Sequence, residues 1–528
     1  MNEETTRRDF LRQLSGFLIA GGAPLVSALE RADAAPPVKV PANVRFNYKL
    51  APWTGDDFTL GHRLRDKDTP NAPIDADEHY DFVIVGGGVA GLTAAYYLRD
   101  HNVLLLEQYD ELGGQSRGAS HRGIKYSYGA AYVGDVEGLY GDLYSEIGIK
   151  PEKIPPRKNG WYWESKWYQD IAGKDTCSLY KEFARLQQQS KPVWKSLPED
   201  PSPDNVDTAA MDKLDMLRFI DVLKGYSPQF LDLLDKFVLS SYCGGLAQIS
   251  ALSGYMLLTD LITPSYVFEG GNTAIPRALV SKIDAAGKGR LLRDAFVWEV
   301  SVGDEQASVI YSTKNGVMHR ARCAHVIVTA PPLVAARFMN GIADKLKAYL
   351  LQMKFGSYLV ANCLLSKRLF TGTYDNWVGK PFSFADITIA ETPYLINKSY
   401  KAEMGSVLTI YQPYGIGSPG RAQLYIGDRQ QFANSIVSQL STLVAHLSGS
   451  LDEVVLSRWG HAMAVPGLGY WSRLRKIHAL EGDERFSLAH NSMQGMPSAE
   501  AAITAARVAA DRALSKPNKV STLFSDLR

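Results

Sequence analysis

The sequence predicts an α/β fold with a parallel sheet, and two observations carry this prediction. Residues 80–85 form a continuous apolar run bounded by turn residues, which is typical of a strand buried on both faces. A glycine-rich turn, an Ala-rich helix-favouring segment at 92–98 and a second apolar run at 103–106 follow directly. This order of strand, turn, helix and strand indicates the start of a doubly wound sheet.

Length and composition exclude several classes of protein. The chain has 528 residues, enough for about three structural units. Its 57 basic and 56 acidic residues leave a net charge of +1, which argues against a protein that binds nucleic acid by neutralising phosphates. The four cysteines are far apart and form no C-x-x-C motif, so a zinc ribbon and a c-type haem motif are excluded. We expect no metal site.

The first 34 residues predict a twin-arginine export signal. Arg7 and Arg8 precede an apolar stretch from Gly16 to Leu29 and an A-x-A site at residues 32–34. The apolar stretch is shorter than the ~20 residues that a membrane-spanning helix needs. The alternative is an amphipathic N-terminal helix of the mature fold. Because this route exports folded proteins, we expect a cofactor that is loaded in the cytoplasm. We also expect a periplasmic location. Residues 35–79 would form an N-terminal extension.

The turn after the first strand has the pattern G-x-G-x-x-G, with Gly86, Gly88 and Gly91. These glycines permit, in order, a tight turn, close approach of a pyrophosphate and close packing of the helix on the strand. The start of the helix offers N–H groups and a partial positive charge to the phosphates. Glu107 lies 21 residues after Gly86, where a carboxylate can bind both ribose hydroxyls of an adenosine. The pattern therefore predicts a bound dinucleotide, either NAD or FAD.

The residues after Glu107 distinguish the two dinucleotides. Residues 112–117 and 129–132 resemble segments of the flavin-containing amine oxidase superfamily, which includes monoamine and polyamine oxidases. In that family the first segment reads G-G-R-x-x-[ST], and its arginine contacts the FAD pyrophosphate. Gly114 matches this pattern, Gln115 stands where the family has arginine, and Arg117 is the nearby residue that could replace it.

Later segments resemble the same family in the same order, so that the resemblance covers residues 80–510. Residues 268–279 resemble the segment before a strand whose Val297 would contact adenine through its backbone. Residues 326–332 resemble the strand that re-enters the FAD-binding domain.

The C-terminal segments at 486–491 and 499–502 complete the resemblance. Asn491 replaces the acid that contacts the pyrophosphate in the family, and Ala499 begins the helix that points N–H groups at the flavin. The resemblance implies FAD as the cofactor.

The family's architecture implies how the chain divides. We expect a discontinuous Rossmann-like FAD-binding domain made of residues 80–150, 262–340 and 455–515. Residues 151–261 and 341–454 would form a second, mixed-sheet substrate domain with a helical cap. Apolar residues at helical spacing between Leu214 and Val238 predict core faces of that cap, and the alternation at 406–411 predicts a strand.

The resemblance implies oxidation of an amine by hydride transfer to flavin N5. An aromatic cage holds the amine in this family, and the segment that carries it contains Trp459, Tyr470 and Trp471. The alternative is a tryptophan packed at a domain junction. A lysine that promotes reaction with oxygen is also typical of the family, and Val360 or Ala361 stands in its place. Its absence favours a dehydrogenase that passes electrons to a quinone or a haem protein.

A looser resemblance, to bacterial spermidine dehydrogenases of the periplasm, rests on residues 61–66 and 358–362. That branch can carry a haem beside FAD, and His62 is the most suggestive ligand, although a core or surface histidine is the more frequent case.

Three functions remain open from the sequence. The first is oxidation of a small-molecule amine, polyamines included, with oxygen, a quinone or a haem protein as electron acceptor. The second is FAD-dependent desaturation or isomerisation of a carotenoid or fatty acyl chain. The third is a non-catalytic FAD-binding partner protein. Nucleic acid and a membrane span are not expected in any of them.

Overall fold

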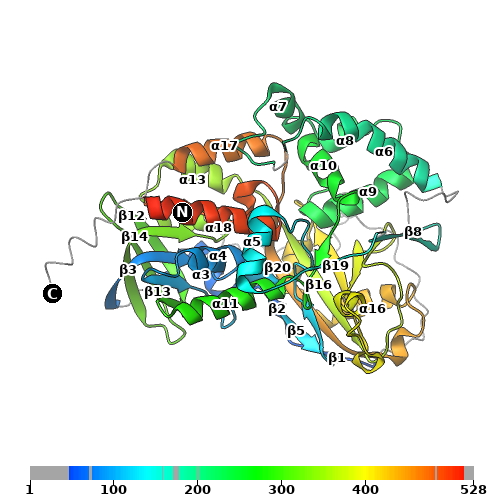
Figure 1. The fold of residues 1–528 in the computed structure, drawn as a ribbon, viewed down its shortest axis with the longest axis horizontal. Helices are drawn as coiled ribbons and strands as arrows, with labels where there is room; N and C mark the ends of the chain where they lie inside the picture. The colour runs from blue at the N-terminus through cyan, green and yellow to red at the C-terminus, as the bar shows by residue number, and fades with distance from the viewer. Residues whose placement is uncertain are drawn as a thin grey trace, which may run out of the picture.

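The computed structural model shows a two-lobed α/β protein with a cluster of helices above the second lobe (Figure 1). The predicted export signal lies outside the described residues. No helix in the described part of the chain is long and apolar enough to cross a bilayer. The structure describes residues 47–70, 74–156, 158–169, 178–198, 201–481 and 485–515.

The first lobe contains an eight-stranded sheet. Its central strands are parallel, and β12 and β13 extend it with antiparallel pairs. The sheet order is β11 (Gly289–Leu292), β4 (Val103–Leu106), β3 (Ile74–Val85), β14 (Met318–Val328), β13 (Ala307–Ser312), β12 (Phe296–Val302) and β15 (Met339–Asn340), with β21 (Phe486–Leu488) beside β14.

Helices cover both faces of this sheet. One apolar core joins it to α4 (Val89–Tyr97), α5 (Gly138–Ile147), α11 (Ala274–Ala286) and α18 (Ala499–Ser515). A second core joins it to α12 (Pro332–Phe338), α13 (Asp344–Leu351) and α17 (Tyr470–Glu481). This lobe is the predicted Rossmann-like unit, and its parts come from distant segments of the chain, as expected of a discontinuous domain.

The second lobe contains a nine-stranded mixed sheet, which agrees with the predicted fold class. Strand β17 pairs with β8 in parallel, whereas β16 pairs with β19 and β20 antiparallel. The order is β1 (Lys49–Leu50), β20 (Leu451–Ala464), β16 (Phe355–Leu365), β19 (Ser406–Tyr414), β18 (Asp386–Ile389), β17 (Asp375–Val378), β8 (Asn159–Trp163) and β9 (Lys166–Tyr168), with β2 (Thr54–Gly55) also beside β20.

Strand β20 corrects the predicted domain boundary at residue 455. The strand runs from Leu451 to Ala464 and pairs along its length with β16, so it belongs to the second sheet. The N-terminal extension contributes to both sheets, because β1 and β2 pair with β20 and β3 begins at Ile74. Pairing between segments about 90 residues apart leaves no local periodicity, and the sequence therefore did not reveal this boundary.

The helical cap lies above the second sheet (Figure 1). In α9 (Pro228–Tyr242) the Ser227 hydroxyl accepts the Phe230 N–H at 3.2 Å, and Pro228 occupies the first helical position. Its buried residues from Phe230 to Val238 confirm the predicted core face. The other cap helices are α6 (Ser178–Trp194), α7 (Ala209–Asp215), α8 (Phe219–Val222) and α10 (Ala251–Leu257).

Shorter elements complete the fold. They are α3 (Thr59–Arg65), η1 (Gly114–Ser116), β5 (Gly118–His121), β6 (Ile124–Ser127), β7 (Glu152–Lys153), η2 (Leu258–Leu261), β10 (Tyr266–Val267), η3 (Gly271–Thr273), α14 (Thr392–Ile396), η4 (Ala402–Met404), α15 (Gly420–Ile426), α16 (Arg429–Leu440), η5 (Leu447–Gly449) and η6 (Asn491–Gln494).

Candidate active site

One cavity of about 2110 Å³ is lined by residues of both sheets and of the cap. A typical pocket for one small ligand measures about 300–1,000 Å³. The cavity therefore has room for a dinucleotide and a second molecule together.

The glycine-rich turn between β3 and α4 forms one end of this cavity. Gly86 has a φ of +108°, a conformation that favours glycine. A Cβ atom on Gly91 would lie 1.8 Å from the Gly86 carbonyl oxygen, so the helix packs directly against the turn. A Cβ on Gly88 would meet only the Gly114 Cα, at 3.9 Å. This geometry is that of a turn open to a phosphate group.

Glu107 lies in the cavity wall at the end of β4, with 6% of its surface exposed. One carboxylate oxygen accepts the Gly87 N–H at 2.7 Å and the other accepts the Tyr109 N–H at 3.0 Å. Burial raises the pKa of Glu107. The two backbone donors fix the carboxylate and leave further lone pairs that could accept ribose hydroxyls.

Gln115 and Arg117 both make contacts inside the protein. The Gln115 side chain lines the cavity and donates to the Ala462 carbonyl of β20 at 2.8 Å. Arg117 is buried, donates to the Gly55 and Gly114 carbonyls, and does not line the cavity. Three other arginines do line the cavity: Arg65, Arg337 and Arg421.

Three further predicted cofactor residues line the cavity: Val297, Asn491 and Ala499. Ala499 begins the 17-residue helix α18, whose N-terminus therefore opens onto the cavity. The next residue, Glu500, accepts the backbone N–H groups of Gly134 and Asp135 and ties this terminus to the chain before α5. The open turn, the fixed carboxylate and this helix end together fit FAD.

The second sheet supplies another wall of the cavity. Residues opposite one another on paired strands share a face of the sheet. The pairs are Trp459 with Tyr358, Val360 with Tyr411, Tyr411 with Asp386, and Asp386 with Trp377. All of these residues line the cavity.

Of the three predicted cage residues, the structure brings only Trp459 to the cavity. Its side chain is 4% exposed, and its Nε1–H donates to the Tyr128 carbonyl at 3.0 Å. Tyr470 and Trp471 lie in the apolar core of the first lobe and do not line the cavity. The Tyr470 hydroxyl donates to the Ser492 carbonyl at 3.1 Å.

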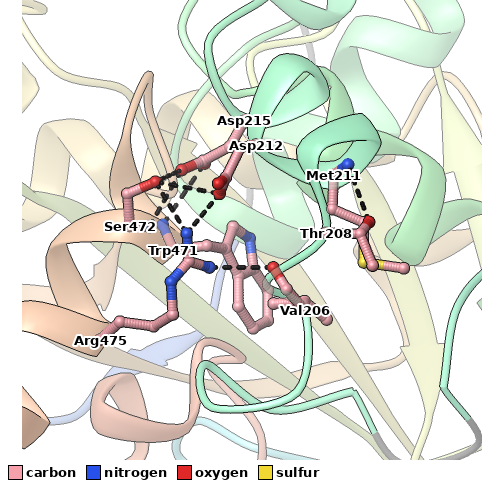
Figure 2. Close-up of polar contacts among 8 residues, drawn as sticks. All are labelled: Val206, Thr208, Met211, Asp212, Asp215, Trp471, Ser472 and Arg475. Atoms are coloured by element: carbon pink, nitrogen blue, oxygen red, sulfur yellow. Dashed lines mark hydrogen bonds and ion pairs between the residues drawn. The ribbon is translucent and has the colours of Figure 1, made fainter.

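Figure 2 shows where Trp471 lies, at the start of α17 and against the cap helix α7. The Asp215 carboxylate accepts the backbone N–H groups of Trp471 and Ser472, at 3.3 and 3.1 Å (Figure 2). Arg475 forms an ion pair with Asp212 on the same cap helix. The first turn of α17 thus holds the cap on the first lobe. Trp471 is therefore a tryptophan packed at a domain junction, the alternative to a cage residue.

The two residues that stand in place of the superfamily's lysine face opposite sides of the second sheet. Val360 faces the cavity, whereas Ala361 faces the core on the opposite side of the sheet, against α16. His62 of α3 also lines the cavity; its ring stacks on Phe58 at 5.5 Å and meets Tyr425 edge-on at 4.8 Å. The haem remains a prediction from the looser resemblance.

Several carboxylates of the cavity were not predicted from the sequence, and three of them lie beside the second sheet: Asp260, Asp375 and Asp386. A weak signal for two of them exists. Residues 375–378 and 386–389 are short strands that are buried throughout, and each begins with an aspartate. A carboxylate in a strand buried on both faces is unusual and indicates a site of function.

Comparisons with known proteins agree with this geometry. A profile of the family described as FAD dependent oxidoreductase matches residues 81–238. Flavin-containing amine oxidase A of Equus caballus is 37% identical over 82 residues, and this match spans 15% of the chain and 16% of the relative.

Solved structures share the fold over most of the chain. Putrescine oxidase bound to putrescine superposes with a TM-score of 0.65 at 15% identity, covering 83% of this chain and 100% of that one. Cyclohexylamine oxidase from Brevibacterium oxydans gives 0.64 at 14% identity, over 83% and 99%. A fatty acid isomerase from P. acnes gives 0.61 at 15% identity, over 82% and 98%. The local sequence match and the shared fold thus support the resemblance to the flavin-containing amine oxidases.

Proposed function

We propose that this protein is an FAD-dependent oxidoreductase that oxidises an amine. The observation that carries the proposal is that one cavity joins the dinucleotide-binding turn to a wall of aromatic rings and carboxylates. The ring faces of Trp459, Tyr358 and Tyr411 would favour a cationic or lone-pair nitrogen in that wall. The dinucleotide and the amine would then share the cavity.

A bound flavin would accept a hydride from the C–H bond next to the amine nitrogen. The chain's own residues bind, orient and exclude water. Trp459 is held in place by its hydrogen bond to the Tyr128 carbonyl, and Val360 contributes an apolar side chain to the same wall. Hydrolysis of the oxidised C=N product would then give a carbonyl compound and a free amine or ammonia. A cationic amine would lose its ammonium proton to solvent before the hydride is transferred, because the nitrogen reacts in its neutral form.

The wall also bears on the alternative of a carotenoid or fatty acyl substrate. Asp260, Asp375 and Asp386 all line the cavity. Packing a hydrocarbon chain against buried carboxylates is costly, since these groups would lose water without gaining a partner. The carboxylates therefore favour a cationic amine.

We propose a dehydrogenase rather than an oxidase. Val360 provides no hydrogen-bond donor or charge at the position where the superfamily's lysine promotes reaction with oxygen. Electrons would pass to a quinone or a haem protein.

Anaerobic mixing of the purified holoprotein with spermidine, putrescine and aromatic amines tests the proposal. We expect loss of the flavin absorbance with at least one of them. If none bleaches the flavin, the proposal is wrong, and a stable flavin with a co-purifying protein would support a non-catalytic binding partner. A Soret band in the same spectrum would show whether haem is present.

We also propose that the protein is exported to the periplasm by the twin-arginine route. The pair Arg7 and Arg8 before an apolar stretch supports this. In a double variant Arg7→Lys and Arg8→Lys, the flavoprotein should remain in the cytoplasmic fraction, while the unaltered chain is recovered from the periplasm. Equal fractionation of the two would contradict export by this route.

A further inference from the structure

Three carboxylates line the cavity beside the second sheet, from η2 (Asp260), β17 (Asp375) and β18 (Asp386). Strands β17 and β18 are antiparallel, with Asp375 opposite Thr388 and Trp377 opposite Asp386. The two aspartates therefore share the cavity face of the sheet, one diagonal step apart.

Asp375 has an unsatisfied oxygen. Its side chain is 5% exposed, and its Oδ1 atom accepts no hydrogen bond from any residue that the structure describes. The nearby cation, Lys158, is held elsewhere: its Nζ atom donates to the Ser265 hydroxyl at 2.5 Å and lies 3.8 Å from Asp260 Oδ1. A buried acceptor without a donor destabilises the folded protein. Its retention at a cavity wall points to a donor on the ligand.

Asp386 is 4% exposed and accepts a hydrogen bond from the Ser240 hydroxyl at 2.6 Å. Ser240 is itself 2.5 Å from the Tyr358 hydroxyl. Burial raises the pKa of Asp386 to about 7, and burial together with the charge of Asp386 raises the pKa of Asp375. In the absence of a cation the pair therefore retains a proton at neutral pH.

The groups around the pair leave its negative charge largely uncompensated. The titratable and charged side chains that face the two aspartates are those of Lys158, Asp260, Tyr132, Tyr358, Tyr374 and Tyr411. Tyr132 donates its hydroxyl to Asp260 at 3.1 Å, so it offers no donor to Asp375. Lys158 is the one cation among these groups.

A metal ion does not fit this wall. Within the described ranges, no three His, Cys, Asp or Glu side chains are placed to hold one. The carboxylates are spread along the strands and are flanked by the rings of Trp377 and Tyr411. Spread carboxylates beside aromatic faces suit an organic ammonium group.

We infer that Asp375 and Asp386 form a subsite for the distal ammonium of a diamine or polyamine. Binding of this ammonium would displace the proton that the raised pKa of the pair retains. The inference rests on the proposed function, because the other nitrogen must lie near the flavin, on the side of the cavity that Val360 of β16 faces. Val360 lies opposite Tyr411 and Tyr411 lies opposite Asp386, so two strand spacings, about 10 Å at ~4.8 Å each, separate Val360 from Asp386. Since the distal ammonium approaches its carboxylate to ~2.8 Å, a diamine or polyamine can bridge the remaining span.

Binding is best measured apart from turnover. Holoprotein whose flavin has been reduced beforehand with dithionite accepts no hydride, so an amine can bind without being oxidised. We expect calorimetry to show putrescine binding about tenfold to hundredfold more tightly than butylamine, since a hydrogen bond to a charged group is worth about 1.5–3 kcal/mol. The ratio should increase as pH rises through about 7, because the pair is then already ionised and ammonium binding no longer has to displace a proton.

Variants assign the effect to the pair. Asp375→Asn and Asp386→Asn should each reduce the ratio of putrescine to butylamine affinity towards one. Asp235→Asn is the matched control, because Asp235 accepts the Leu246 N–H in the cap and does not line the cavity. It should retain the ratio of the unaltered protein. If one of the two test variants fails to fold, the other variant and the comparison of amines in the unaltered protein still test the subsite.

Two failures are distinguishable. If putrescine and butylamine bind equally well to the reduced holoprotein, the subsite does not exist, whether or not amines bleach the oxidised flavin. If putrescine binds more tightly and depends on Asp375 and Asp386 but no amine bleaches the flavin, the subsite stands as a binding site and the proposed oxidation is wrong. Proton release of about one per putrescine near pH 6, found by comparing buffers, would support the exchange; no release would overturn it.

Discussion

The dinucleotide-binding turn and the carboxylate wall face the same cavity but are built in opposite ways. The turn comes from one continuous stretch, residues 80–107, and offers a ligand backbone N–H groups beside glycines. The wall comes from strands β16 to β20, spread over residues 355–464, and uses side chains throughout. A ligand shared by many proteins can be bound by a local motif, whereas a specific substrate is bound by side chains that only the sheet brings together.

Two buried carboxylates show the same contrast. Glu107 has a backbone N–H donor at each oxygen, which suits further contacts with neutral hydroxyls. Asp375 has no donor at Oδ1 among the described residues. The first carboxylate is satisfied before its ligand arrives, and the second requires a donor from the ligand.

The largest effect is expected at the turn. Gly91→Ala would place a Cβ atom 1.8 Å from the Gly86 carbonyl oxygen, so the turn must open. Overpacking of this kind costs about 1–3 kcal/mol, and we expect the affinity for FAD to fall about tenfold or more. Flavin absorbance per protein measures it. Gly449→Ala, where nothing lies within 4 Å of the added atom, is the control. Equal flavin content in both would show that the turn is not tightly packed.

The next effect is expected at the cavity wall. Val360→Lys introduces the superfamily's lysine at a position that faces the cavity. Reoxidation of the reduced flavin by oxygen should become about tenfold faster, below the ~100-fold effect of a well-placed donor. Stopped-flow reoxidation measures the rate, and Val360→Met is the uncharged control of similar length. An unchanged rate of reoxidation would mean that the absence of this lysine does not limit the reaction with oxygen.

A matched pair of tryptophan variants separates the wall from the core. Trp459→Phe should lower the limiting rate of flavin reduction by an amine about threefold to tenfold, because the smaller ring binds a cation less well. Trp471→Phe should lower the free energy of unfolding by about 1–2 kcal/mol, because the Ser253 hydroxyl loses its donor. Stopped-flow reduction and urea unfolding test both variants. A larger loss of the reduction rate in Trp471→Phe than in Trp459→Phe would show that Trp471 belongs to the aromatic cage.

The smallest effect concerns stability and pH. Since burial raises the pKa of Asp386 from 3.8 to about 7, folding favours its protonated form. The stability contributed by this carboxyl is complete below about pH 4 and is lost as pH rises to about 7. Asp386→Asn stays neutral, so its stability relative to the unaltered protein should increase over this range, by on the order of 1 kcal/mol per pH unit. Urea unfolding at several pH values measures the difference, with the exposed Asp110→Asn as control. A difference independent of pH would contradict the raised pKa.

The sequence allowed the first lobe to be predicted in detail. The strand at 80–85, the turn, the helix after it and the strand at 103–106 all lie where expected, although β3 begins earlier, at Ile74. Glycines and continuous apolar runs act within a few residues of one another, so their consequences can be inferred without the fold.

The wall could not be predicted in the same way. Trp459 was expected there together with Tyr470 and Trp471, but the latter two lie in the core of the first lobe. The domain boundary at 455 failed for the same reason as the missed aspartates: both depend on which distant strands pair with one another.

By itself the sequence determined a dinucleotide-binding α/β unit, because a strand, a glycine turn and a helix specify that unit through neighbouring residues. Only the tertiary structure decided which side chains face the substrate. Pairing in the second sheet turns alternate residues of each strand towards the cavity, and a shift of one residue would have turned Asp375 and Asp386 away.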